Sequence, residues 1–240
     1  MWAPLAQVGS DFIRDRSSGN ENCIQQNKLC PGWAIDHIDR YTGPAVEHIV
    51  LVVISVTLGF VIAMGLALLS HRHRWLVPPI TGLTGALYTV PSIAFFFLLL
   101  PITGRGGDTA VIALTAYTLQ IIYRNIVIGL ANVPEEAKES GRGMGMTDRQ
   151  LLRQVELPLA VPEIIAGLRI ATVSTVALAT LAVFAGGGGL GSQIIAGSNI
   201  TFKTGIVVAG GIAILIAISF DALLILAQRV LSPWRKVRPV

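Results

Sequence analysis

The residues best suited to chemistry lie in one polar segment, from Pro134 to Pro162, inside an otherwise apolar chain. The segment mixes acidic and basic side chains with three spaced glycines, between two prolines. Charges orient a protein partner and glycines let two backbones approach closely, so this combination suits recognition. Contact with a soluble partner is therefore predicted, the alternative being a solvated loop that only joins two spans.

A short helix is predicted at the start of this segment. Pro134 suits the first helical position, and Glu135 lies where the helix dipole favours a negative charge. Gly141, Gly143 and Gly145 then weaken the helix and allow a sharp turn.

A second short helix is predicted after the turn. Thr147 and Gln150 have the spacing of a capping box, and Leu151 and Val155 belong to one apolar face. Pro158 is expected to end this helix. A short helix with one apolar face can dock into a groove on a partner.

The chain lacks the residue patterns of an enzyme. An ATP-binding loop needs G-x-x-x-x-G-K-[ST], and the nearest run, GSNITFKT, has Phe202 where the second glycine belongs. No nucleophile elbow and no pair of metal ligands at catalytic spacing occurs, and His71 and His73 are interpreted as interfacial. We therefore predict no metal site, no bound cofactor and no enzymatic activity of the chain itself.

The elements that position the polar segment are predicted to be membrane-spanning helices. The 240 residues are 52% hydrophobic and only 13% charged, whereas soluble domains carry about 25% charged residues. A span needs about 20 mainly apolar residues. The sequence predicts an all-α membrane protein with five transmembrane helices, at about 49–70, 78–100, 109–131, 162–185 and 206–229.

The distribution of basic residues predicts the topology. Lys and Arg favour the cytoplasmic side, and they gather at 71–74, in the polar segment and in the tail. The N-terminus is therefore expected outside and the C-terminus in the cytoplasm, so the net charge of +4 needs no nucleic acid to explain it. The expected divisions are an extracytoplasmic arm with an interfacial helix (1–48), a transmembrane domain (49–230) and a basic cytoplasmic tail (231–240).

The N-terminal arm holds both cysteines, Cys23 and Cys30. Their predicted location on the oxidising side favours a disulfide, and two unlinked thiols in a mobile arm are the alternative. The segment 33–42 is expected to lie on the membrane surface until Gly43 and Pro44 break it.

Three charged residues lie within predicted spans, where charge is costly: Arg124, Arg169 and Asp221. They fall at similar depth, so they could form a buried network, and pairing of Arg124 with Asp221 is the favoured arrangement. Snorkelling to the cytoplasmic interface is the alternative, which is easier for arginine than for aspartate.

Pro91 interrupts the second predicted span, and interrupted helices often border a transport pathway. Tyr88, Thr89, Ser92 and Phe95 surround it and are candidate pathway residues, unless the proline only produces a packing kink. The run 186–191, GGGGLG, is expected to form an outer gate, a re-entrant turn or a flexible loop.

The polar segment resembles the cytoplasmic loop of permease subunits of ABC importers, in which E-A-A, three residues, G, nine residues, I, any residue and L-P follow one another. Here Ser140 and Gly141 replace the two alanines, and Val155 replaces the isoleucine. The resemblance implies that the loop docks in a cleft of an ATPase subunit. The implied coupling residues are Glu139, Ser140, Gly141, Gly143, Met144, Gly145, Met146, Val155, Leu157 and Pro158.

Further stretches resemble the osmoprotectant branch of these permeases, which imports glycine betaine, choline, carnitine or proline betaine. They include YTVPSIA at 88–94, GMGMT at 143–147 and ELPLAVPEIIAGLR at 156–169, and the resemblance covers about 49–230. It implies two permease subunits and two ATPases, which bind ATP and Mg, in the cytoplasmic membrane, supplied by an external binding protein.

Other readings predict different functions. The loop is also compatible with a permease for another small solute, such as an amino acid. An ion-coupled secondary transporter would need coupling carboxylates, and Asp221 is the only acid expected within a span. A non-transporting membrane anchor would have no need for the polar segment.

Overall fold

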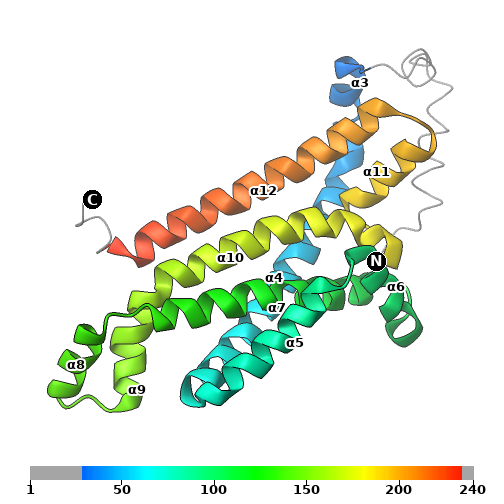
Figure 1. Cartoon of the computed structure of the whole chain (residues 1–240). Coiled ribbons are helices and arrows are strands. Elements are labelled where there is room, and N and C mark those ends of the chain that lie inside the picture. Colours follow the sequence, from blue (N-terminus) through cyan, green and yellow to red (C-terminus); the bar gives the residue numbers. More distant parts are fainter. Residues whose placement is uncertain (1–28, 234–240) are drawn as a thin grey trace. The chain divides into compact units, whose positions relative to one another are not determined.

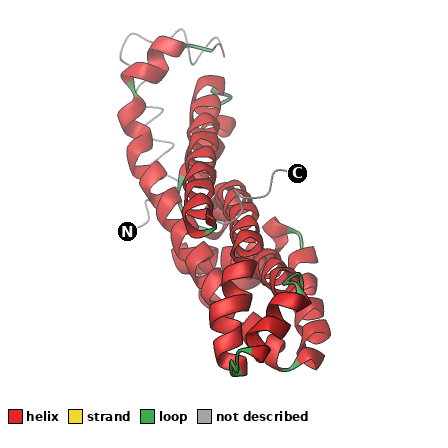
Figure 2. Ribbon diagram, turned by 90° about the vertical axis from the view of Figure 1, so that its left-hand side faces the viewer, coloured by secondary structure: helices red, strands yellow, loops and turns green. Residues whose placement is uncertain are grey.

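The computed structural model describes residues 29–233, and every regular element in this range is helical (Figures 1 and 2). The larger elements are α3 (Pro31–Asp36), α4 (Thr42–Arg72), α5 (Val77–Thr89), α6 (Ser92–Thr103), α7 (Gly107–Ala131), α8 (Glu135–Gly143), α9 (Asp148–Leu151), α10 (Leu157–Ala179), α11 (Leu190–Asn199) and α12 (Lys203–Leu231). Shorter helical turns are η2 (Ile38–Tyr41), η3 (Arg74–Leu76), η4 (Leu152–Glu156) and η5 (Thr180–Ala185).

Among the described residues, four helical stretches are long and apolar enough to cross a membrane, and a bent pair of helices provides a fifth candidate. The four are Ile38–Arg72, Gly107–Ala131, Asp148–Ala185 and Lys203–Leu231, and the pair consists of Arg74–Thr89 and Ser92–Thr103. These stretches confirm the predicted all-α membrane protein, with four spans and a fifth if the bent pair crosses the membrane as one span. The sides on which the two termini lie stay predictions.

The first long helix begins earlier than the sequence indicated. α4 starts at Thr42 and includes Gly43 and Pro44 in its first turn. A proline is tolerated there because the first N–H groups of a helix have no intrahelical acceptor. These two residues therefore start α4, and the predicted domain boundary at 48/49 lies inside a helix.

The interruption predicted at Pro91 is present. α5 ends at Thr89, and α6 begins at Ser92 with Pro91 as its N-cap in an extended conformation (ψ 130°). Proline lacks the N–H that would continue a helix, and its ring restricts the backbone conformation of the residue before it. The helix is therefore interrupted between Thr89 and Ser92.

The expectation that Pro158 ends the second loop helix is wrong, since the helical chain continues through it as α10. The turn before it, Leu152–Glu156, is a π turn in which the Leu157 N–H bonds to the carbonyl of Leu152, five residues back. The wider turn accommodates a proline that would clash in a regular α-helix. Figure 1 shows α9 and α10 running in different directions on either side of this turn.

The glycine-rich run 186–191 is a tight, buried turn, not a flexible loop. Gly186, Gly188 and Gly189 have positive φ angles, and the chain then enters α11. At Gly191 a side chain is excluded, because a Cβ atom would lie 1.9 Å from the carbonyl oxygen of Thr180. The sequence indicated a turn here but not the ten-residue helix that follows it.

The chain divides into two compact units, which are described separately. Within the described residues, unit 1 consists of 29–55, 90–115 and 174–218, and unit 2 consists of 56–89, 116–173 and 219–233. In unit 1, Trp33 is only 2% exposed and packs edge-on against Phe202, with ring centroids 4.6 Å apart. The segment expected on the membrane surface thus buries its tryptophan inside the protein.

Unit 2 contains the polar segment and a separate apolar core. Ile122, Tyr123 and Ile126 of α7 pack with Ala63 of α4 and other buried residues. The Tyr123 hydroxyl donates a hydrogen bond of 3.1 Å to Ser70 Oγ of α4. This core holds together the ends of α4 and α7 that are predicted to lie in the cytoplasm, and the loop follows the end of α7 along the chain.

Candidate functional site

The predicted pair of short helices is present as α8 and α9, joined by a turn at Met144–Thr147 (Figure 1). Pro134 is the N-cap of α8, one position before the place predicted for it. At the other end, the Gly145 N–H bonds to the Arg142 carbonyl and the Met146 N–H bonds to the Gly141 carbonyl. These two bonds are those of a Schellman motif, with Gly145 at the left-handed position (φ 79°).

The start of α9 confirms the predicted capping box. Thr147 Oγ1 accepts a hydrogen bond of 3.4 Å from the Gln150 N–H, and Gln150 Oε1 accepts one of 2.9 Å from the Thr147 N–H. Both bonds satisfy backbone donors that a helix start otherwise leaves unpaired. The capping box and the Schellman motif fix both sides of the turn.

The three glycines of the loop have different roles, contrary to the prediction that all of them weaken the helix and allow a sharp turn. Gly145 alone has a positive φ angle. Gly141 lies within α8 and is buried. A side chain has no room there, since a Cβ atom would lie 2.6 Å from Leu151 Cδ1 and 3.4 Å from Met146 Sδ. A Cβ atom at Gly143 would meet nothing within 4 Å. Close packing of Gly141 on Leu151 therefore joins α8 to α9.

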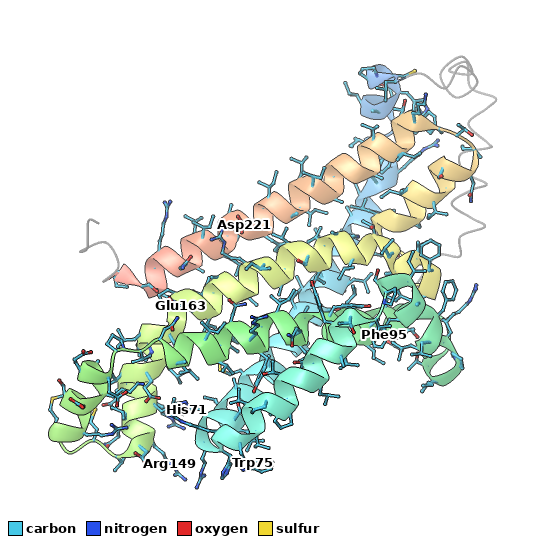
Figure 3. The ribbon with its side chains drawn as sticks, in the orientation of Figure 1. His71, Trp75, Phe95, Arg149, Glu163 and Asp221 are labelled. Carbon is cyan, nitrogen blue, oxygen red and sulfur yellow. The ribbon has the colours of Figure 1, made fainter. Side chains whose placement is uncertain are left out.

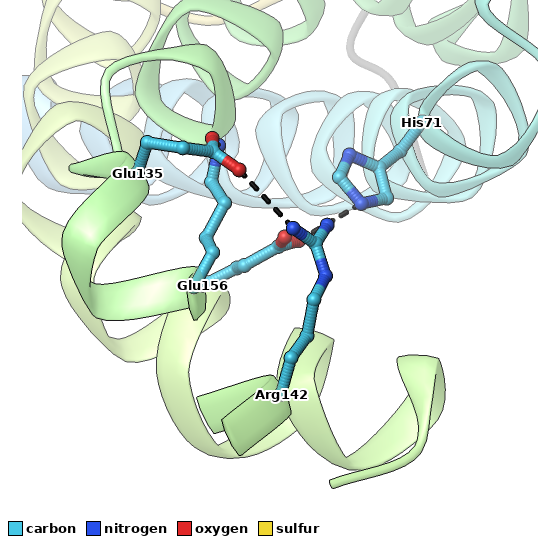
Figure 4. Close-up of polar contacts among 5 residues, drawn as sticks. His71, Glu135, Arg142 and Glu156 are labelled. Atoms are coloured by element: carbon cyan, nitrogen blue, oxygen red, sulfur yellow. Dashed lines mark hydrogen bonds and ion pairs between the residues drawn. The ribbon is translucent and has the colours of Figure 1, made fainter. Parts of the chain in front are cut away.

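Charged side chains stiffen the start of α8 (Figure 4). Glu135 accepts hydrogen bonds of 3.2 Å from Lys138 Nζ and 3.2 Å from Arg142 Nη1. The hydrogen bond from Lys138, followed by its positive charge and by Arg142, lowers the pKa of Glu135 from its ordinary value. The Glu135 side chain is 59% exposed, so water screens both pairs and their contribution to stability is small.

A polar contact that the sequence did not reveal connects the loop to α4. His71 Nε2 lies 2.8 Å from Glu156 Oε2, and the side chain of Glu156 is only 6% exposed (Figure 4). Glu156 belongs to the π turn, at the unspecified position of the motif between Val155 and Leu157. The sequence signal for Glu156 is a single carboxylate within the apolar run 155–162. The pairing could not be predicted from it, because the partner His71, interpreted above as interfacial, is 85 positions earlier in the chain.

The loop and the ends of α4 and α7 enclose a hollow of about 970 Å³ within unit 2. Arg72, Arg74 and Arg149 contribute to its lining, and His71 and Arg149 are labelled in Figure 3. The apolar part of the lining includes Leu130 and Leu151. Beside this hollow the loop contacts the spans through the His71–Glu156 pair and through Leu152 and Leu157, which pack against the apolar core of unit 2.

The predicted coupling residues divide into an exposed set and an inner set. Met144 is 70% exposed at the turn, and Glu139, Ser140, Gly143 and Gly145 are also exposed. The inner set, which holds the loop together, consists of Gly141, Met146, Val155, Leu157 and Pro158, all buried or half-buried. The loop thus offers one accessible surface on a fixed frame.

A family model described as "Binding-protein-dependent transport system inner membrane component" matches residues 55–237 of the chain. The chain belongs to this family. It is therefore a permease subunit of the inner membrane. The matched range contains the whole of the loop and all five candidate spans except the start of the first.

Curated relatives agree with this assignment. One relative is the choline transport system permease protein OpuBB of Bacillus subtilis (strain 168), to which the permease is 38% identical. The alignment covers 188 residues, which are 78% of the permease and 86% of the relative. Another relative is the osmoprotectant import permease protein OsmW of Salmonella typhimurium (strain LT2), to which the permease is also 38% identical. This alignment covers 210 residues, which are 84% of the permease and 96% of the relative.

Two solved structures have a similar fold. The methionine ABC transporter MetNI, in an inward-facing conformation, aligns with a TM-score of 0.66 and 22% identity over 83% of the permease and 96% of that chain. The crystal structure of an amino acid ABC transporter with histidines aligns with a TM-score of 0.70 and 18% identity over 84% and 99%. At these identities the likeness concerns the fold alone.

The charged residues within the spans of the permease are arranged differently from the prediction. Asp221 of α12 pairs with Arg169 of α10 and not with Arg124. Its carboxylate accepts hydrogen bonds of 2.7 Å from Arg169 Nε and 3.0 Å from Arg169 Nη2. Arg124 is exposed on α7. Glu163 lies inside α10, so Asp221, labelled with it in Figure 3, is not the only acid within a span.

The candidate pathway residues near Pro91 belong to both units. Tyr88 and Thr89 lie in unit 2, whereas Pro91, Ser92 and Phe95 lie in unit 1. Phe95, labelled in Figure 3, is 7% exposed and belongs to the packed interior, whereas the ring of Tyr88 is accessible. Their role in a pathway stays a prediction.

One remaining prediction concerns the cysteine pair. Cys23 lies outside the described residues, so the disulfide between Cys23 and Cys30 stays a prediction.

Proposed function

We propose that this permease is the membrane subunit of an ATP-driven importer of osmoprotectants such as glycine betaine or choline. The relatives named for choline and for osmoprotectant import support this substrate class, because each aligns with most of the chain. The permease would function with a second permease subunit, identical or paralogous, two ATPase subunits that bind ATP and Mg, and an external binding protein. Transport of another small solute, such as an amino acid, is the alternative.

The observation that carries the proposal is the frame of the loop. The residues of the ABC-permease pattern occur at its spacing, and those of the inner set pack together while Glu139, Ser140 and Met144 remain accessible. An exposed helical surface on a rigid support can dock in a groove of a partner. We propose that this surface binds the ATPase in the cytoplasm, with the N-terminus of the chain outside.

The packing of the loop provides a route for movement from the ATPase to the spans. Because Gly141 contacts Leu151 closely, α8 and α9 should move as one body when ATP closes the ATPase subunits. The π turn continues directly into α10, and the contact between His71 and Glu156 joins the same turn to α4. Movement of the loop would thereby reach two spans and change which side of the membrane the pathway faces.

Reconstitution tests this proposal. The permease, with its ATPase and binding protein in proteoliposomes, should accumulate labelled glycine betaine or choline only when ATP is present. Gly145→Val should weaken ATPase binding and uptake, because a β-branched residue at a φ of 79° distorts the turn.

Gly104→Val is the matched control, since Gly104 has a φ of 76° and, like Gly145, no atom within 4 Å of a built Cβ, but lies outside the loop. It should leave ATPase binding intact. Equal loss of ATPase binding in both variants would contradict the role of the loop. Uptake of an amino acid instead of both quaternary ammonium compounds would contradict the substrate class.

A further inference from the structure

We infer that unit 2 contains a selective contact for zwitterionic substrates, in which Arg124 binds a carboxylate and the ring of Tyr88 binds a quaternary ammonium group. The inference rests on the proposed function and adds how the permease itself distinguishes a betaine from choline. Glycine betaine and carnitine carry both groups, whereas choline has the quaternary ammonium group and a hydroxyl in place of the carboxylate.

Arg124 is the first part of this contact. It lies within α7, a candidate span, and its side chain is exposed. In the range 29–233 no carboxylate lies within ion-pair distance of it, whereas Arg169 is engaged by Asp221. A charge inside a span is costly and marks a functional site unless it is paired. A guanidinium group also matches a carboxylate with two parallel hydrogen bonds.

The second part is a pair of tyrosines that are 29 positions apart in the sequence. The rings of Tyr88 and Tyr117 pack edge to face, with centroids 5.9 Å apart and an angle of 71° between the planes. Tyr117 is 5% exposed, whereas Tyr88 is 46% exposed. Tyr117 therefore positions the Tyr88 ring, whose accessible face can attract a quaternary ammonium group.

The helix geometry places both parts on one strip of unit 2. Tyr117 and Arg124 are seven positions apart, which is about two turns, so they share one face of α7 with a rise of about 10 Å between them. Between these positions, Gln120 Oε1 accepts a hydrogen bond of 2.5 Å from Thr84 Oγ1 of α5. This bond fixes α5, and with it Tyr88, beside the same face of α7.

The other border of the strip is α10. A Cβ atom at Gly167 would lie 2.3 Å from Asn125 Cβ, and one at Gly129 would lie 2.9 Å from Glu163 Cβ, so α10 packs closely on α7. On the helical wheel this contact lies about 100–140° from Arg124, whereas Tyr117 and Gln120, which contact α5, lie within about 40° of Arg124 on either side. In Figure 1, α7 runs between α5 and α10. Arg124 thus shares the face of α7 that packs on α5, next to the border with α10, and its side chain remains exposed there.

The arrangement fits an extended zwitterion. Tyr88 is near one end of the strip and Arg124 near the other, and the long, flexible arginine side chain can shorten the distance between its head and the aromatic ring. Choline can use the tyrosine contact alone. Loss of the arginine should therefore affect only substrates that carry a carboxylate.

Parallel uptake assays test this inference in the reconstituted transporter with its ATPase and binding protein. We expect Arg124→Gln to lower uptake of labelled glycine betaine by about tenfold or more relative to uptake of choline, because a charge-assisted hydrogen bond is lost. Tyr88→Leu should lower uptake of both substrates by similar factors. Arg105→Gln removes the same charge from an exposed position outside the strip and should leave the ratio unchanged.

The outcomes separate this inference from the proposed function. A wild-type complex that imports neither substrate contradicts the proposed function, and import of choline alone contradicts the inference. If only glycine betaine is imported, the inference requires its loss in Arg124→Gln but not in Arg105→Gln. Equal reduction of both substrates by Arg124→Gln, or no reduction, overturns the inference, because an arginine that only snorkels or supports the fold cannot distinguish them.

Discussion

The close packing of Gly141 on Leu151 makes a quantitative prediction about the rigidity of the loop. Gly141→Ala would place a Cβ atom 2.6 Å from Leu151 Cδ1, inside the distance of ordinary contact, and Leu151 is 3% exposed and has little room to move. Overpacking of this kind costs about 1–3 kcal/mol. Alanine also has a helix propensity higher than that of glycine by up to about 1 kcal/mol, which offsets part of this cost.

Gly143→Ala is a matched control for this effect, since it introduces the same methyl group two positions later in α8. A Cβ atom at Gly143 meets nothing within 4 Å, so this variant gains helix propensity and loses no packing. The free energy of local opening should therefore be lower in Gly141→Ala than in Gly143→Ala by about 1–3 kcal/mol, which corresponds to about 5- to 150-fold.

Amide hydrogen exchange in the full-length permease in nanodiscs measures this difference, because exchange rates report local opening. The informative amide is that of Met146, whose N–H bonds to the Gly141 carbonyl at 3.1 Å. It should exchange faster in Gly141→Ala than in Gly143→Ala by the factor given above. Equal rates in the two variants would refute the argument that this contact holds α8 against α9.

Three further predictions concern other parts of the molecule. Asp221→Asn and Arg169→Gln should each lower the thermal stability of the purified permease, and a double-mutant cycle should give a coupling of about 1 kcal/mol, whereas additive effects would refute the pair. The lowered pKa of Glu135 adds stability to α8 that is complete above the ordinary value of 4.5 and is lost as the pH falls through the lower folded value. Exchange of the α8 amides between pH 6 and pH 3 should show this loss in the wild type and not in Glu135→Gln, and identical profiles would contradict it. Gly191→Ala should abolish the yield of monodisperse permease, because its Cβ would lie 1.9 Å from the Thr180 carbonyl oxygen, and a normal yield would contradict the close approach.

Local signals in the sequence predicted the spans and the loop. Long apolar runs give the spanning helices because a bilayer sets the required length. Pro91 ends a helix for a steric reason that applies in any surroundings. The capping box of Thr147 and Gln150 involves residues three positions apart, so its spacing is enough to predict it.

Contacts between distant residues were not predictable in the same way. Arg124 and Arg169 were assigned a similar depth in the membrane, and the choice of Arg169 as the partner of Asp221 depends on the rotation of three helices, which composition does not determine. The contact of Tyr88 with Tyr117 depends on the packing of α5 on α7 in the same way.

Prolines and glycines in the sequence mark positions of unusual backbone conformation or close packing, but their local preference does not always predict the structural result. Pro158 does not end the helix, because the π turn before it removes the clash. Gly141 is required by the proximity of Leu151 and not by a turn. In both cases the sequence gives the local preference, and the tertiary structure decides how it is used.

Photo-cross-linking from the tip of the loop tests the central claim most directly. A photoreactive amino acid in place of Met144, which is 70% exposed in the loop turn, should form an adduct with the ATPase subunit in the assembled transporter. The same amino acid in place of Ile102, which is 79% exposed at the end of α6, should not. An adduct from position 102 and none from position 144 would contradict both the predicted topology and the role of the loop in coupling.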